Sequence, residues 1–170
     1  MKTVALVLLC VLALVPLSAA ADDTLVKFRG GIGVIPVSSG VGTAATAEIV
    51  NRNIVRGVQP AGQIWVISDL KAEVKADGSI RVDGRGLLLG GGNNIGLNAN
   101  ARVFATLICE AATPFTERST SAAGVPLEAN GDFEIDDLLS PAPTACASPV
   151  LLIRNAANLG WFAAGIPKVD

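Results

Sequence analysis

The chain has 170 residues, with 13 basic and 15 acidic side chains, no histidine and no tyrosine. This slightly acidic balance does not favour binding to nucleic acid or to anionic lipid. The absence of histidine excludes Ser-His-Asp and Cys-His catalysis, histidine acid–base chemistry and the common zinc and copper sites. Any chemistry must therefore rest on carboxylates, lysine, hydroxyls, amides or the backbone, and we expect no cofactor and no bound metal.

Residues 1–21 have the pattern of a secretory signal peptide. Lys2 precedes the apolar run Val4–Val15, and the small residues Ser18–Ala21 follow it, which is the order of charged start, apolar core and cleavage site. The run is too short to span a bilayer, and no later stretch is long enough. We therefore predict a secreted protein, extracellular or periplasmic, with no membrane span in the mature chain and a single β-sandwich domain over residues 22–170.

Cys109 and Cys146 remain after removal of a signal peptide that contains Cys10. Two cysteines in a chain bound for an oxidising compartment favour one structural disulfide. The alternative, a reactive thiol, lacks a basic partner and a CxxC motif. Closing a loop of this length is expected to stabilise the fold by about 4 kcal/mol in the chain-entropy model.

The clearest structural pattern is a β-hairpin over Ile64–Leu89. Apolar and charged residues alternate in both halves, and Ala76-Asp77-Gly78 between them has the chemistry of a turn. Pairing Val74 with Ile80 sets opposite charges across the two strands, whereas pairing Val74 with Val82 sets like charges against each other. We therefore predict the first register.

In that register, the charged face of the hairpin becomes apolar at the end far from the turn. One interpretation is that a second sheet or a loop covers this end, so that it belongs to the core; the other is an exposed aromatic patch that binds a partner. Apolar surfaces of β-proteins are usually core. The candidate binding patch consists of Trp65, Ile67, Leu87 and Leu89.

The stretch Val125–Leu138 resembles the first hairpin, since LEANGDFEID aligns with VKADGSIRVD. With Ala129-Asn130-Gly131 as its loop, Leu127 pairs with Phe133 and Val125 pairs with Ile135. We therefore predict a second hairpin with the same kind of turn.

Short apolar segments separated by Gly, Pro and Asn predict the fold class. We expect an all-β protein, an antiparallel β-sandwich of roughly eight to ten short strands with one disulfide. No segment predicts a helix of normal length, and the stretch Gly90–Arg102 is expected to be a loop with several positive-φ residues. Further strands are expected in Leu25–Ser39, Val103–Glu110, Val150–Ile153 and Trp161–Ala164.

Carboxylates are the only candidates for catalysis or cation binding. Paired acids serve glycoside hydrolysis, but those enzymes also need a cleft lined with aromatic residues. Oxygen ligands at Glu128, Asn130 and Asp132 would suit Ca²⁺, but the spacing of an EF-hand is absent. The candidate acidic cluster consists of Glu128, Asp132, Glu134, Asp136 and Asp137.

No motif specifies a chemistry. We interpret the protein as a secreted, non-catalytic β-sandwich module that binds or coats an extracellular partner, either a protein or a polysaccharide. The alternative is a carboxylate-dependent hydrolase or a Ca²⁺-dependent carbohydrate binder that uses the acidic cluster. A third hypothesis is a proteinase inhibitor or secreted effector that acts through Gly90–Asn100.

Overall fold

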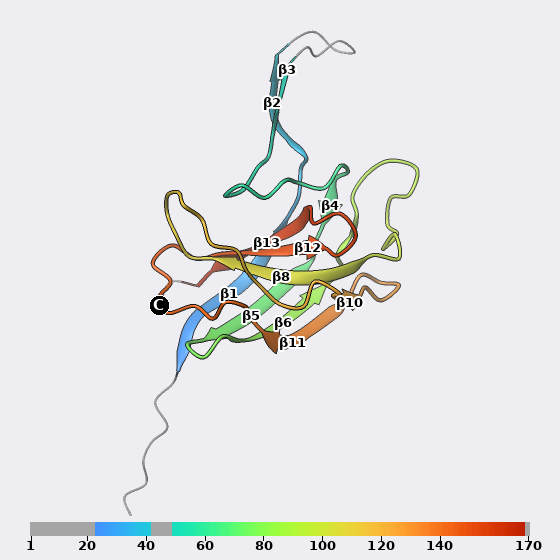
Figure 1. Cartoon of the computed structure of the whole chain (residues 1–170). Coiled ribbons are helices and arrows are strands. Elements are labelled where there is room, and N and C mark those ends of the chain that lie inside the picture. The colour runs from blue at the N-terminus through green and yellow to red at the C-terminus, as the bar shows by residue number, and fades with distance from the viewer. Residues whose placement is uncertain (1–22, 42–48, 169–170) are drawn as a thin grey trace, which may run out of the picture.

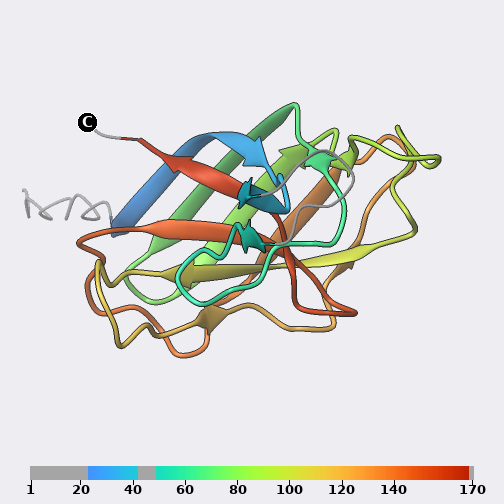
Figure 2. The same cartoon turned by 90° about the horizontal axis from the view of Figure 1, so that it is seen from above.

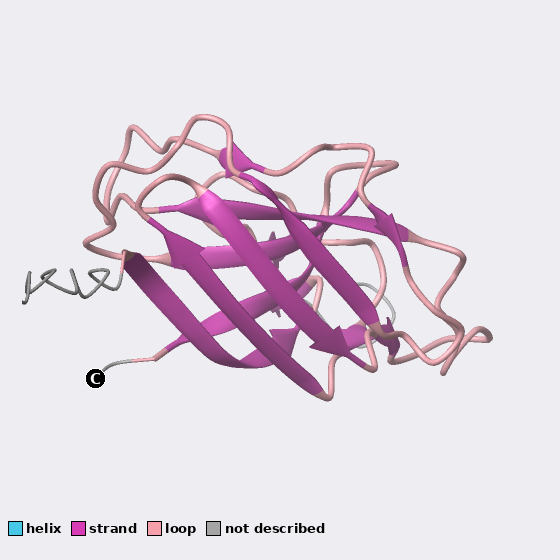
Figure 3. Cartoon of the chain, turned by 90° about the horizontal axis from the view of Figure 1, so that it is seen from below, coloured by secondary structure: helices cyan, strands magenta, loops and turns pink. Residues whose placement is uncertain are grey.

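The computed structural model describes residues 23–41 and 49–168, and every regular element within them is a β-strand (Figure 3). The prediction of an all-β antiparallel fold is confirmed. The described residues form thirteen strands rather than eight to ten because several strands are only two residues long. The strands are β1 Thr24–Gly33, β2 Val37–Val41, β3 Ile49–Arg52, β4 Trp65–Val66, β5 Asp69–Lys75, β6 Ser79–Arg85, β7 Leu88–Leu89, β8 Arg102–Ile108, β9 Arg118–Ser119, β10 Val125–Pro126, β11 Phe133–Leu138, β12 Val150–Asn155 and β13 Trp161–Pro167.

Nine strands form one sheet in the order β10-β8-β12-β13-β1-β5-β6-β11, and β9 also pairs with β8. The end strands β10 and β11 lie near each other, so the sheet nearly closes on itself. Figures 1 and 2 show two layers, in which β8, β12 and β13 cross β1, β5, β6 and β11. The two layers of the predicted sandwich are therefore halves of one curved sheet, joined where β1 pairs with β13.

The hairpin of β5 and β6 has the predicted register. Its paired residues include Val74 with Ile80, and the short strands β4 and β7 continue the register with Trp65 opposite Leu89. Gly78 in the turn has a φ of 91°, as the sequence predicts, and its N–H donates to the Lys75 carbonyl at 3.0 Å.

The charged face of this hairpin is solvated, but its ion pairs differ from the cross-strand set that the register suggested. Arg81 pairs with Glu134 of β11 rather than with Glu73 opposite. Arg85 pairs with Asp83 of its own strand at 2.9 Å and with Asp132 at 3.0 Å. Long arginine side chains thus bind acids of the same strand, of the neighbouring strand and of the turn before it.

The second predicted hairpin forms its turn but not its strand pairing. The Glu128 N–H donates to the Asp132 carbonyl at 2.9 Å, and Gly131 has a φ of 83°. The predicted pairing of Leu127 with Phe133 and of Val125 with Ile135 is wrong, because β10 pairs with β8 and β11 pairs with β6. β10 and β11 therefore pair with the seven-residue strands β8 and β6 instead of with each other. Gly84 of β6 has no side chain, which leaves space for the Phe133 ring.

Cys109 and Cys146 form the predicted disulfide, with a Cα–Cα distance of 4.5 Å. It fastens the Pro-rich segment before β12 to the end of β8, where the Ser148 N–H also donates to the Cys109 carbonyl at 3.1 Å. The predicted signal peptide lies outside the described residues. No helix in the described ranges has the length and apolar character needed to cross a membrane.

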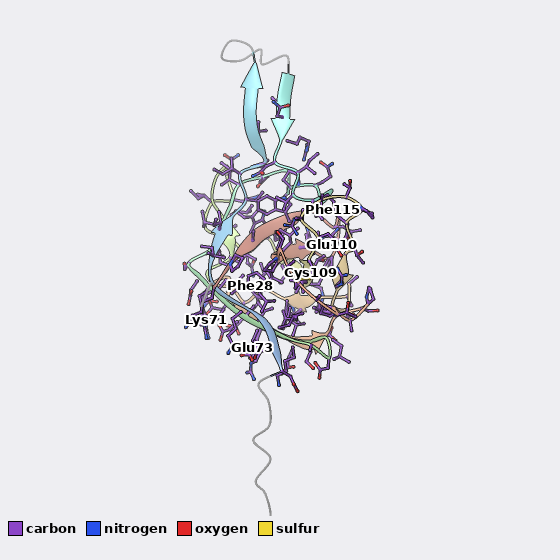
Figure 4. The ribbon with its side chains drawn as sticks, turned by 90° about the vertical axis from the view of Figure 1, so that its left-hand side faces the viewer. Phe28, Lys71, Glu73, Cys109, Glu110 and Phe115 are labelled. Carbon is purple, nitrogen blue, oxygen red and sulfur yellow. A yellow bond between two sulfur atoms is a disulfide. The ribbon has the colours of Figure 1, made fainter. Side chains whose placement is uncertain are left out.

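The core lies between the two layers, and Phe28 and Leu107 are among its fully buried side chains. β8 and β12 are also buried on their outer faces, as Phe104 and Leu152 illustrate. Connecting segments cover this side of the sheet. In Figure 4, Cys109, Glu110 and Phe115 of the segment after β8 lie on this covered flank, whereas Lys71 and Glu73 of β5 lie on the opposite flank. We call β8, β12 and β13 the covered layer and β1, β5, β6 and β11 the open layer.

Arginine side chains fasten the covering segments to the covered layer. Arg154 donates to the Leu159 carbonyl at 2.8 Å and pairs with Glu117. Arg56 donates to the Ile108 carbonyl at 3.1 Å and to the Ser148 carbonyl at 2.6 Å. Such multiple bonds use the fork of N–H donors that guanidinium provides.

Candidate ligand-binding cleft

A cleft of about 490 Å³ opens on three loops of the body. We call it the alanine cleft because alanine methyl groups make up most of its walls. The first loop precedes β8, the second follows β9 and the third joins β12 to β13. Its lining residues are Trp65, Ala99, Asn100, Ala101, Arg102, Ala122, Ala123, Asn155, Ala156, Ala157 and Phe162.

Two stacked aromatic rings lie at the inner end of the cleft. The Trp65 and Phe162 ring centroids are 3.8 Å apart, and the ring planes are inclined by 16°. Both residues are buried, with 4% and 2% of their surface exposed. Their backbones are joined through Val34, which donates to the Phe162 carbonyl at 2.8 Å and accepts from the Trp65 N–H at 3.1 Å. Val34, directly after β1, therefore joins the backbone of β4 to that of β13 and holds the two rings next to each other.

Asparagine side chains hold the first and third walls, through bonds within each loop and, for the first wall, to the segment after β10. Asn98 donates to the Leu127 carbonyl at 3.1 Å and accepts from the Asn100 N–H at 3.0 Å. In the third loop, Asn155 accepts from the Ala157 N–H at 2.9 Å. Asparagine side chains commonly stabilise turns in this way. The walls are thus shaped without a ligand.

Arg102 braces the second wall. Its guanidinium donates to the Ala123 carbonyl at 2.9 Å and to the Gly124 carbonyl. Among the described residues that line the cleft, Arg102 is the one charged side chain and none is a carboxylate.

The polar groups of the cleft that remain for a ligand are one indole and two carboxamides. Trp65 is 4% exposed, and in the described residues the one fully buried side-chain nitrogen or oxygen without a partner is Arg118 Nε, so the Trp65 indole nitrogen is not a buried unsatisfied donor. The indole N–H of Trp161 donates to the Asn53 carbonyl at 3.0 Å. The carboxamides of Asn100 and Asn155 also line the cleft.

The candidate binding patch is mostly core. Trp65, Leu87 and Leu89 are buried, and Ile67 is half-buried against the core. Of the two interpretations of this apolar end, the structure supports coverage by other parts of the fold. Trp65 alone also lines the alanine cleft.

The acidic candidates are not brought together. No group of three or more Asp, Glu, Cys or His side chains suited to a metal ion occurs in the described part of the chain. Asp132 accepts from the Gly86 N–H at 3.0 Å, and this bond, with help from Arg85 and Asn130, lowers the pKa of the carboxyl. Glu134 pairs with Arg81, and Asp137 accepts from the Ser121 N–H at 2.9 Å. Glu128 and Asp136 are exposed.

The expected loop Gly90–Arg102 does contain positive-φ residues, and Ala99 and Asn100 are two of them. Sequence analysis did not identify the cleft or Phe162. A signal was present, because Ala122-Ala123 and Ala156-Ala157 place paired methyl groups in loops where polar residues are usual. Compared with family models, curated proteins and solved structures, the chain matches none.

Proposed function

We propose that the protein is a secreted, non-catalytic module that binds an extracellular partner in the alanine cleft. The observation that carries this proposal is the preformed cleft itself, which has the stacked rings of Trp65 and Phe162 at its inner end and six alanines along its walls. A preformed apolar cavity with a few convergent polar groups is the usual form of a small-ligand site.

The chemistry of the walls selects the ligand class. Alanine methyl groups match an apolar surface, and the indole N–H with the carboxamides of Asn100 and Asn155 matches carbonyl and hydroxyl groups. The Arg102 guanidinium donates from Nε and from one Nη to backbone carbonyls, so part of its donor fork is occupied within the wall. We infer that the ligand is an uncharged N-acetylated sugar unit of an extracellular polysaccharide.

The test is an NMR titration of the ¹⁵N-labelled protein with N-acetylglucosamine, with glucose in parallel. The two tryptophans provide an internal comparison, because Trp65 faces the cleft and the Trp161 indole is bonded to Asn53. We expect the indole resonance of Trp65 to move in a saturable way with N-acetylglucosamine while that of Trp161 stays in place.

A blocking variant completes the test. Ala157→Phe fills the cleft from an exposed position and should abolish the shift, whereas Ala112→Phe, at an exposed alanine outside the cleft, should retain it. If the Trp65 resonance is unmoved, or if Ala157→Phe shifts as the natural sequence does, the cleft is not the sugar site. A shift with a peptide such as N-acetyl-leucinamide instead would assign the cleft to a protein partner.

Export is tested separately by N-terminal sequencing of the protein recovered outside the cytoplasm. Cleavage after Ala20 or Ala21 would give Ala21 or Asp22 as the first residue. Protein that retains Met1 and stays in the cell would contradict secretion.

A further inference from the structure

Arg102 gives the alanine cleft a positive charge that nothing in its walls balances. It is the one charged side chain among the described residues that line the cleft. It belongs to no ion pair in the described part of the chain, whereas Arg81, Arg85 and Arg154 each pair with a carboxylate. An unbalanced charge in a cleft raises the local concentration of ligands of the opposite sign.

The wall of the cleft also fixes the direction of the Arg102 guanidinium. Its Nε donates to the Ala123 carbonyl at 2.9 Å, and its Nη2 donates to the Gly124 carbonyl. These two donors share one edge of the planar group, so the other edge, Nη1 with the second hydrogen of Nη2, has no acceptor within residues 23–41 and 49–168. Two N–H donors on one edge match the two oxygens of a carboxylate. Because the wall already holds the guanidinium, a carboxylate that binds it costs little side-chain entropy.

The charge and the aromatic rings lie in different parts of the cleft. Trp65 and Phe162 are buried at the inner end, whereas Arg102 is exposed and therefore lies toward the solvent. The cleft volume of about 490 Å³ is that of a pocket for a drug-sized ligand, which is larger than one sugar ring. A polysaccharide with one unit near the rings thus has its next unit near the guanidinium.

We propose that the polysaccharide is acidic, and that a uronic acid unit beside the N-acetylated unit places its carboxylate on the open edge of Arg102. This inference rests on the proposed function, because it assigns the neighbour of the sugar unit assigned to the cleft. The alanine methyl groups and the carboxamides of Asn100 and Asn155 bind the uncharged unit, and Arg102 selects the charged one. A neutral chain leaves the guanidinium without an anion and binds more weakly.

Isothermal titration calorimetry with two tetrasaccharides of equal length tests the inference. Every unit of chitotetraose is N-acetylated, whereas hyaluronan tetrasaccharide alternates N-acetylglucosamine with glucuronic acid. At about 50 mM salt we expect hyaluronan tetrasaccharide to bind about tenfold more tightly, because it gains one charge-assisted pair. Raising the salt concentration to about 500 mM should remove most of this preference, because salt screens an exposed charge.

Arg102→Gln removes the charge but keeps an amide group that can donate to a wall carbonyl. This variant should bind the two tetrasaccharides with equal affinity. Arg52→Gln is the matched control, since the exposed Arg52 donates to the Pro60 carbonyl at 3.4 Å and lies outside the cleft. It should keep the full preference for hyaluronan tetrasaccharide.

The outcomes separate this inference from the proposed function. If neither tetrasaccharide binds or moves the Trp65 indole resonance, both are wrong. If chitotetraose binds and hyaluronan tetrasaccharide binds no more tightly, the cleft is a site for a neutral polysaccharide and the acidic unit alone is wrong. A preference that Arg102→Gln retains, or that high salt leaves unchanged in the natural sequence, overturns the assignment to Arg102.

Discussion

The covered layer and the open layer use the same residue type in opposite ways. In the open layer, the Arg81 and Arg85 side chains are 68% and 57% exposed and bind the acids of neighbouring strands and turns. In the covered layer the Arg154 side chain is 7% exposed, and in β9, which pairs with β8 of that layer, the Arg118 side chain is 12% exposed. The first pair lies on a solvated sheet face, whereas the second pair lies beneath loops.

The difference follows from what each arginine bonds. Arg154 reaches Thr106 as well as Leu159 and Glu117, and its guanidinium lies 5.3 Å from the centre of the Phe104 ring. These contacts replace water around groups that the covering loops bury. Exposed ion pairs contribute little to stability because water competes for both partners, but a buried donor or acceptor that loses its partner is costly. The stability of the covered layer should therefore depend on a few specific side chains.

The disulfide should have the largest effect. The double substitution Cys109→Ser and Cys146→Ser opens a connection with a sequence separation of 37, and we expect the free energy of unfolding to fall by about 4 kcal/mol. Urea unfolding followed by tryptophan fluorescence measures the loss. An unchanged midpoint would mean that the covering segments are held by their arginines alone.

Arg154→Met should come next, with a loss of about 2–3 kcal/mol, because the Leu159 carbonyl and the Thr106 hydroxyl lose a charged donor. Arg81→Met in the open layer is the matched control and should cost less than about 1 kcal/mol. Urea unfolding of both variants measures the difference. Equal losses would remove the distinction between the two layers.

The β5–β6 hairpin of the open layer was predictable from local sequence because alternation and turn chemistry act over neighbouring residues. The predicted register from Asp69 to Arg85 is the observed one, although the arginines bind other acids than those opposite them. The turn at Ala129–Gly131 was predictable for the same reason. The partners of its flanking strands were not, because β8 and β6 compete for them from distant parts of the sequence.

The alanine cleft could not be predicted from neighbouring residues either, because distant parts of the sequence form it. Its walls come from three loops, and the backbones of Trp65 and Phe162 are joined through Val34, directly after β1. The hairpin register placed Trp65 in the apolar end of the hairpin. Only the tertiary fold shows that Trp65 is buried in the core and also lines the cleft. Nothing in the spacing of Phe162 indicated its stacking partner.

The smallest effect concerns acid stability of the covered layer. Arg118, with the Thr116 N–H, lowers the pKa of Glu110 from 4.5 to about 2. The folded state thus favours the ionised carboxylate, and its stabilisation is complete above the unfolded pKa and is lost as pH falls from about 4.5 through about 2. Glu110→Gln should lower the unfolding free energy near neutral pH, and its difference from the natural sequence should shrink over this interval. Urea unfolding measured across the pH range checks this.

In an Arg118→Met background the pH-dependent difference between the protein with Glu110 and its Glu110→Gln variant should largely disappear. If this difference persists unchanged, the ion pair of Arg118 with Glu110 is not its source.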